Sequence, residues 1–130
     1  MVTTDLTGDT FERTIAMGIV LVDWWAPWCG PCLAFAPVYA AAAARHPDVT
    51  FAKVNTEAER ELAQPAGIRA IPTLMAFREG MLFFERPGAL TGEALDELIR
   101  LLRSIDLTVA RERLAAERAG ASPQTRARAK

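Results

Sequence analysis

The feature that most constrains the fold is an apolar segment followed directly by an alanine-rich one. Residues 19–25 read Ile-Val-Leu-Val-Asp-Trp-Trp, which is β-branched and aromatic with one polar residue. This composition is typical of a strand buried on both faces. Pro27 ends the strand, and the composition from about Pro31 to Arg45 predicts a helix that Pro37 kinks. A strand buried on both faces needs helices above and below its sheet, so this pair predicts an α/β fold.

The patterns along the rest of the chain extend this arrangement. Thr91 suits a helix N-cap, and the apolar residues after it recur at three- and four-residue spacing, which predicts a helix over 91–104. Alternating strands and helices indicate a parallel sheet, to which a late hairpin turning at Glu79-Gly80 adds antiparallel strands. The other expected elements are strands at 49–55, 73–77 and 82–85 and short helices at 8–16 and 57–64.

The C-terminal end differs in charge from the rest of the chain. From Ile105 onward there are six basic and three acidic residues, a net charge of +3, whereas the remainder carries −4. Residues 109–119 predict a weak helix, and 120–130 contain no core-forming residue, so we expect disorder there. The composition therefore predicts one domain over 1–107 and a solvated, charged tail over 108–130.

Charge and hydropathy disfavour several classes of protein. A net charge of −1 over 130 residues gives no electrostatic case for binding nucleic acid or an anionic membrane. The apolar run 19–26 is too short to span a bilayer and contains Asp23. The first twenty residues lack the basic and apolar regions of a signal peptide, so we expect a cytoplasmic location.

Cys29 and Cys32, the two cysteines of the chain, lie where the predicted strand gives way to the helix. A pair this close closes almost no loop, which favours a chemical over a structural role. At a helix N-terminus, unpaired N–H groups and the helix dipole stabilise a thiolate on the first cysteine. We therefore expect Cys29 to attack a substrate disulfide and Cys32, one turn in and shielded, to resolve the mixed disulfide.

Two other interpretations of the cysteine pair remain open from the residues alone. Two cysteines at this spacing are also half of a zinc site, but tetrahedral zinc needs four ligands and His46 is the one histidine. His46 itself fits a helix end, where a cation is favourable. The second interpretation is that the thiols are buried and inert.

Residues 20–32, which read VLVDWWAPWCGPC, resemble the active-site segment of the thioredoxin family. The resemblance covers about residues 5–105 and implies a central mixed sheet flanked by helices on both faces, in agreement with the pattern above. Further matching segments follow in the family's order and spacing, at 53–55 (KVN), 67–73 (GIRAIPT), 77–80 (FREG) and 87–90 (PGAL).

The resemblance assigns roles that the residues alone do not. Asp23, by itself more often a satisfied core group, matches the family's buried carboxylate and becomes a candidate general base for Cys32. Lys53 matches the lysine near that carboxylate. Pro72 matches the family's cis-proline, which would leave the backbone of Ile71 free to pair with an extended substrate. The implied apolar docking surface consists of Trp28, Gly30, Pro31, Ile71 and Gly88.

The dipeptide Gly30-Pro31 resembles that of reducing thioredoxins, whereas oxidants and isomerases of the superfamily more often carry a histidine there. The resemblance thus implies a protein-disulfide reductase without a bound cofactor or metal. Its implied partners are disulfide-containing proteins and an NADPH-dependent flavoprotein reductase. An oxidase or isomerase, or a non-catalytic binding or chaperone-like module using the Pro72 groove, are the alternatives. Leu33 and Ala70 depart from the family, which more often has a basic residue and a glycine there.

Overall fold

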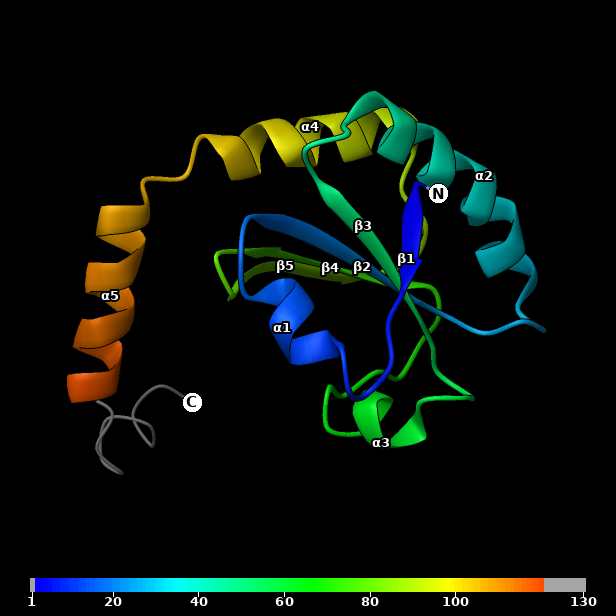
Figure 1. The fold of residues 1–130 in the computed structure, drawn as a ribbon, viewed down its shortest axis with the longest axis horizontal. Coiled ribbons are helices and arrows are strands. Elements are labelled where there is room, and N and C mark those ends of the chain that lie inside the picture. The colour runs from blue at the N-terminus through cyan, green and yellow to red at the C-terminus, as the bar shows by residue number, and fades with distance from the viewer. Residues whose placement is uncertain (1, 121–130) are drawn as a thin grey trace.

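A mixed sheet of five strands forms the centre of the structure, a computed structural model that describes residues 2–120 (Figure 1). The strand order is β1-β3-β2-β4-β5, with β1, β3 and β2 parallel and with β4 and β5 antiparallel to their neighbours. The predicted α/β class is confirmed. The strands are β1 (Thr3–Asp5), β2 (Ile19–Trp25), β3 (Thr50–Asn55), β4 (Thr73–Arg78) and β5 (Met81–Pro87).

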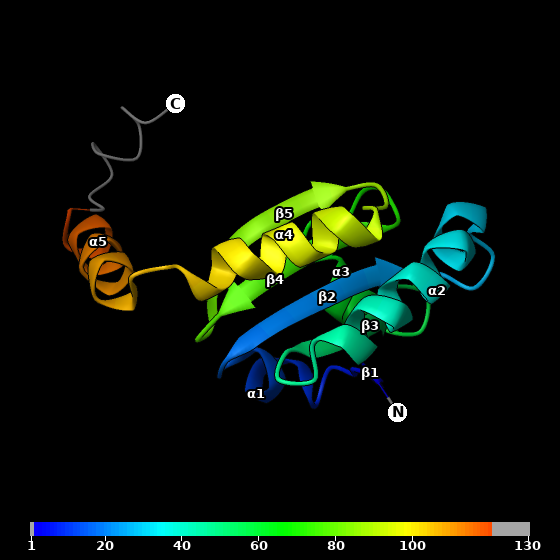
Figure 2. The same cartoon turned by 90° about the horizontal axis from the view of Figure 1, so that it is seen from above.

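Helices cover both faces of this sheet, as the two views show together (Figures 1 and 2). The pair α2 and α4 lies over one face, and the short α1 and α3 lie over the other. Each face carries its own hydrophobic cluster, so β2 is buried from both sides, as its apolar sequence predicts. The helices are α1 (Phe11–Ile15), α2 (Gly30–Arg45), α3 (Arg60–Ala63), α4 (Gly92–Arg103) and α5 (Leu107–Ala119).

The helix α4 is capped at its start and is joined to α2 by an ion-pair network. The hydroxyl of Thr91 caps α4 by accepting from the Ala94 N–H at 3.0 Å, as expected of an N-cap. His46 ends α2, and its Nε2 lies 2.7 Å from Oδ1 of Asp96 on α4. Arg45 reaches the same Asp96 oxygen at 3.1 Å. These contacts fix the C-terminal end of α2 against α4.

Short elements differ from the sequence-based expectations. The strand β1 is not predicted, because its Thr-Thr-Asp sequence has no apolar alternation; it exists through parallel pairing with β3. The helices α1 and α3 are shorter than the expected 8–16 and 57–64. The predicted turn at Glu79-Gly80 is confirmed, with φ of 51° and 82° at these residues, the positive values that a tight hairpin turn requires.

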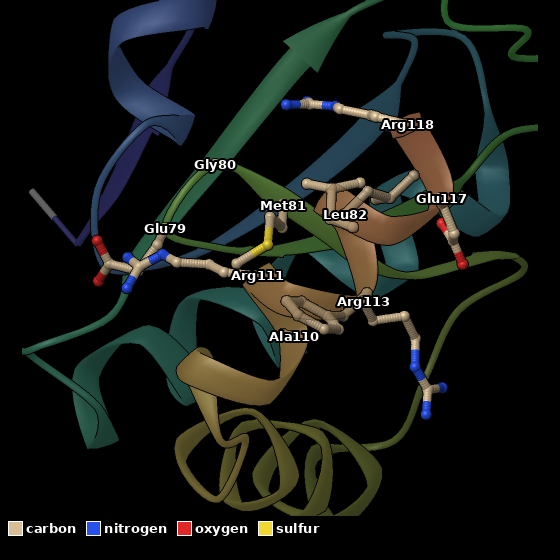
Figure 3. A pocket seen from close by; sticks show the side chains of 11 residues that line it. Glu79, Gly80, Met81, Leu82, Ala110, Arg111, Arg113, Glu117 and Arg118 are labelled. Atoms are coloured by element: carbon tan, nitrogen blue, oxygen red, sulfur yellow. The ribbon is translucent and has the colours of Figure 1, made fainter. Parts of the chain in front are cut away.

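The helix α5 stands apart from the sheet and its covering helices (Figure 1). It begins at Leu107 after an Asp106 cap, two residues before the expected 109–119 helix, and none of its residues is buried. Between α5 and the β4–β5 hairpin lies an open groove of about 690 Å³, lined by Met81 and Leu82 on one side and by three arginines of α5 on the other (Figure 3). The disorder expected for 120–130 concerns, apart from Gly120, residues outside those described. No helix within residues 2–120 has the length and apolarity needed to cross a membrane.

Because α5 buries none of its residues, we expect the chain truncated after Leu107 to keep its stability. Its free energy of unfolding in urea should equal that of the full chain within about 0.5 kcal/mol. The matched control is Leu102→Ala, which empties a 2% exposed position of α4 and should cost about 2–5 kcal/mol. A truncated chain destabilised as much as the control would show that α5 contributes to the core.

Candidate active site

The cysteine pair lies where the central strand β2 passes into α2. Cys29 is the N-cap of the helix with extended backbone angles, and Pro31 occupies the first turn, where its missing N–H costs nothing. The Cys32 N–H donates to Cys29 Sγ at 3.2 Å. The two sulfurs form a disulfide, with Cα atoms 5.2 Å apart. The structure is therefore that of the oxidised pair, and it places one backbone donor on Cys29.

Both cysteines are buried in this oxidised state. Cys29 is 4% and Cys32 2% accessible, and they form a small cluster with Ala26 against Trp25 and Ile71. Cys29 Sγ lies 3.8 Å from the carbonyl oxygen of Ile71, so the loop before Pro72 covers it. In this state the Sγ of Cys29 is thus shielded from solvent.

Asp23 is a buried acid in the middle of β2. It is 1% accessible, and neither carboxylate oxygen has a hydrogen-bond partner among the described residues. Burial raises the pKa of Asp23 to about 7, against a smaller lowering by the charge of Lys53. The same carboxylate contributes, after burial, to the raised pKa of Tyr39, whose hydroxyl donates to the Ala52 carbonyl at 2.8 Å. Asp23 can thus gain or lose a proton near neutral pH.

Lys53 is placed beside Asp23 by strand register. The two residues are direct partners in the parallel β2–β3 pair, so their side chains leave the same face of the sheet. The Lys53 ammonium lies 4.6 Å from the ring centre of Trp25, a cation–π contact. Trp25 in turn packs on the cysteine cluster. The register therefore brings together the carboxylate and the lysine that the resemblance pairs.

The loop before β4 lies against the cysteines. The Ile71–Pro72 peptide bond is cis, as the resemblance implies. The carbonyl of Pro72 accepts from the Gly88 N–H at 2.7 Å, and Gly88 adopts a φ of 98° that favours glycine. Ile71 is thus next to Cys29, and Gly88 is tied to the neighbouring Pro72, although both are far from Cys29 in sequence.

Trp28 lies on the surface beside Cys29, with 67% of its area exposed. Its indole N–H donates to a carboxylate oxygen of Glu57, just after β3. The backbone N–H of Glu57 donates to Oδ1 of Asn55 at 3.0 Å, which fixes this turn. Sequence reasoning missed Glu57, because nothing in its local pattern relates it to a tryptophan 29 positions earlier. Gly30 and Pro31 are exposed next to Trp28.

A zinc site at the cysteines is not supported by the arrangement. His46 lies at the far end of α2, about 24 Å along a 16-residue helix from the cysteines, and contacts Asp96. Within residues 2–120 there is no group of three or more potential His, Cys, Asp or Glu ligands. The cysteines face each other instead, which suits dithiol–disulfide chemistry.

The raised pKa of Asp23 predicts a pH-dependent cost of keeping this carboxyl buried. From pH 3.8 to about 7 the unfolded state releases the Asp23 proton and the native state keeps it, so this contribution to stability falls as the pH rises. The full cost, about 4 kcal/mol, is reached above pH 7. Asp23→Asn removes the charge. The free energy of unfolding of the oxidised variant, relative to that of wild type, should therefore increase by about 4 kcal/mol as the pH rises from 4 to 8.5.

Urea unfolding of the oxidised proteins at both pH values measures this gain. Asp5→Asn, a change of the same charge at an exposed position of β1, is the control and should show no such pH-dependent gain. If the stability difference between Asp23→Asn and wild type were the same at both pH values, the carboxyl would titrate alike in the folded and unfolded chains.

Comparisons with known proteins agree with this geometry. The thioredoxin family model, described as "Thioredoxin", matches residues 2–101. The chain is 47% identical over 120 residues to a putative thioredoxin 2 of Streptomyces coelicolor, covering 92% of this chain and 90% of that protein. It is 41% identical over 91 residues to a thioredoxin of Chlamydia muridarum, covering 70% of this chain and 89% of that protein.

A solved thioredoxin structure from Malassezia sympodialis has a TM-score of 0.66 and 31% identity, covering 76% of this chain and 89% of that one. The alignment with the Streptomyces protein spans 120 of the 130 residues and so includes α5. The shared fold and the paired cysteines at the β2–α2 junction lead to one conclusion. The chain belongs to the thioredoxin family and is a thiol–disulfide oxidoreductase of the protein-disulfide reductase type.

Proposed function

We propose that this protein works as an electron donor, reducing disulfides of other proteins, rather than as an oxidase or isomerase. One observation carries the direction: the described structure gives Cys29 Sγ a single protein donor, the Cys32 N–H. Gly30 has no side chain and Pro31 has neither a side-chain donor nor an N–H, so the residues between the cysteines add no side-chain donor. A thiolate with little support makes the reduced form less stable and the disulfide more stable, which favours giving up electrons.

In the proposed cycle the Cys29 thiolate attacks one sulfur of a substrate disulfide, and the other substrate sulfur leaves as a thiolate. Cys32 then attacks Cys29 Sγ in the mixed disulfide, releasing the second substrate thiol and closing the Cys29–Cys32 disulfide. The substrate gains two electrons and the protein loses two. The position of Cys29 beside the Ile71 carbonyl, where a partner docks, supports its role as the attacking residue.

Asp23 and Lys53 act in the second step of this cycle. Cys32 must lose its proton to attack, and a buried carboxyl with a pKa of about 7 can accept a proton at neutral pH. The Lys53 charge opposes the effect of burial and keeps that pKa from rising further. We propose that Asp23 is the general base for Cys32 and that Lys53 adjusts the pKa of Asp23.

The substrate docks on the surface around Cys29. Trp28, Gly30 and Pro31 supply one side of it, and Ile71 and Gly88 supply the other, with Pro72 buried next to Ile71. The backbone of Ile71 pairs with an extended substrate segment, as in strand addition. A chaperone-like module could use the same surface, but it would not need the buried carboxyl and the paired sulfurs beneath.

We further propose that an NADPH-dependent thioredoxin reductase regenerates the dithiol, that the protein is cytoplasmic, and that it serves electron transport and cell redox homeostasis. The exchange chemistry belongs to a domain over 1–107, with 108–130 as a charged tail that takes no part in it. The lack of buried residues in α5 supports this division. The chain truncated after Leu107 tests it, because it should reduce insulin at the full-length rate.

The redox potential tests the direction of electron flow. We expect the pair to equilibrate below the cytosolic glutathione poise of about −220 to −260 mV, near the value of about −270 mV found for thioredoxin itself. Thiol trapping after equilibration in glutathione and dithiothreitol buffers measures it. A potential well above the glutathione poise would make the protein an oxidase or isomerase.

The roles of the two cysteines are tested with single variants. Reduced Cys32→Ser protein, mixed with insulin, should accumulate a mixed disulfide through Cys29, because the resolving thiol is missing. Cys29→Ser should form no such adduct and should lose turnover. Non-reducing electrophoresis followed by mass spectrometry identifies the linked residue. An adduct formed by Cys29→Ser but not by Cys32→Ser would reverse the assignment.

A further inference from the structure

The exposed face of α2 next to the cysteines carries no polar side chain. From Ala26 to Ala44 the sequence contains no charged residue. In α4, by contrast, every exposed position except Leu101 is charged, as is usual for a helix on a protein surface. The exposed residues of α2 before Arg45 are Gly30, Pro31, Leu33, Ala34, Pro37, Ala41 and Ala44.

Leu33 is the one large side chain on this face. It is 52% exposed, so packing in the core does not explain why this residue is a leucine. Its backbone N–H donates to the Cys29 carbonyl at 3.0 Å, which places Leu33 one helical turn after Cys29. Side chains four residues apart lie on the same face of a helix. Leu33 therefore lies at the cysteine end of the exposed face of α2, one turn from the N-cap Cys29.

Leu33 extends the docking surface in a direction that the other docking residues do not cover. Trp28 lies before the cysteines and Ile71 on the opposing loop, whereas Leu33 lies beyond Cys32 along the helix. A partner side chain resting on Leu33 loses water and meets no opposite charge on α2 before Arg45. An apolar side chain gains from this contact, and α2 offers a charged one no compensation for its desolvation.

We propose that Leu33 is a specificity-determining residue that selects polypeptide disulfides whose cysteine is flanked by an apolar side chain. The proposal rests on the proposed disulfide reduction and adds the class of substrate. It assigns Leu33 no part in the exchange of sulfur bonds. Its role is to bind the residues beside the substrate cysteine while Cys29 reacts.

Two disulfide-linked peptides that are identical except for a leucine or a glutamate next to the cysteine test this. Each rate constant is divided by that for hydroxyethyl disulfide, which has no flanking residue and so corrects for changes in thiol reactivity. Wild type should prefer the leucine peptide by about fivefold in kcat/KM, since a half-exposed leucine recovers part of its burial free energy. Leu33→Ala should bring this preference close to one.

Leu33→Lys should go further and reverse the preference toward the glutamate peptide, because it places a cation where the acidic flank rests. The matched control is Leu101→Ala, at an equally exposed leucine (51%) near the end of α4 that is distant from the cysteines, and it should keep the wild-type preference. Comparison of wild type with the three variants thus distinguishes an effect specific to position 33 from the effect of removing any exposed leucine.

Three outcomes would overturn the inference. Equal use of both peptides by wild type, or a wild-type preference retained in Leu33→Ala, would contradict the role of Leu33 while leaving disulfide reduction intact. A wild-type protein that reduces neither peptide nor hydroxyethyl disulfide would contradict the proposed function itself, and the role of Leu33 with it.

Discussion

The pairing of β2 on both of its edges is the constraint on which the rest of this structure depends. It is hydrogen-bonded to β3 in parallel and to β4 in antiparallel register, and its side chains are buried on both faces. Because both edges are paired and both faces are covered, the direction of β2 and the position of its C-terminal end are fixed. Because α2 begins just beyond that end, the cysteines are held at a defined edge of the sheet. The parallel register also sets Lys53 beside Asp23.

Burial of Asp23 in this strand has two opposite effects: it lowers the stability of the fold, and it raises the pKa of the carboxyl toward neutral pH. An apolar residue at position 23 would pack without the cost that the buried carboxyl carries above neutral pH. The same burial moves the pKa of Asp23 to about 7, where a group can accept and return a proton under working conditions. A solvated carboxylate would be stable but too weak a base for a thiol. In the proposed cycle this destabilising residue is the proton acceptor for Cys32.

The surface around the cysteines combines segments that are distant in the chain. The loop before α2 supplies Trp28 and the first turn of α2 supplies Leu33. The loop before β4 supplies Ile71 and Pro72, and the turn after β3 supplies Glu57, which accepts from the Trp28 indole. With both sulfurs almost fully covered, access to Cys29 depends on a partner that fits these segments. In the proposed function, the sulfurs carry out the exchange and the residues around them bind the partner.

The sequence by itself determined the α/β class, the long elements and the cysteine pair, because these depend on local composition and spacing. The apolar run of β2, the alanines of α2 and the hairpin turn at Glu79-Gly80 each show in a few consecutive residues. Tertiary structure alone decided the rest. The strand β1 forms by pairing with β3. Folding is also what brings Glu57 to Trp28 and the loop at Ile71 to Cys29. Each of these depends on contacts between distant segments, which no local pattern encodes.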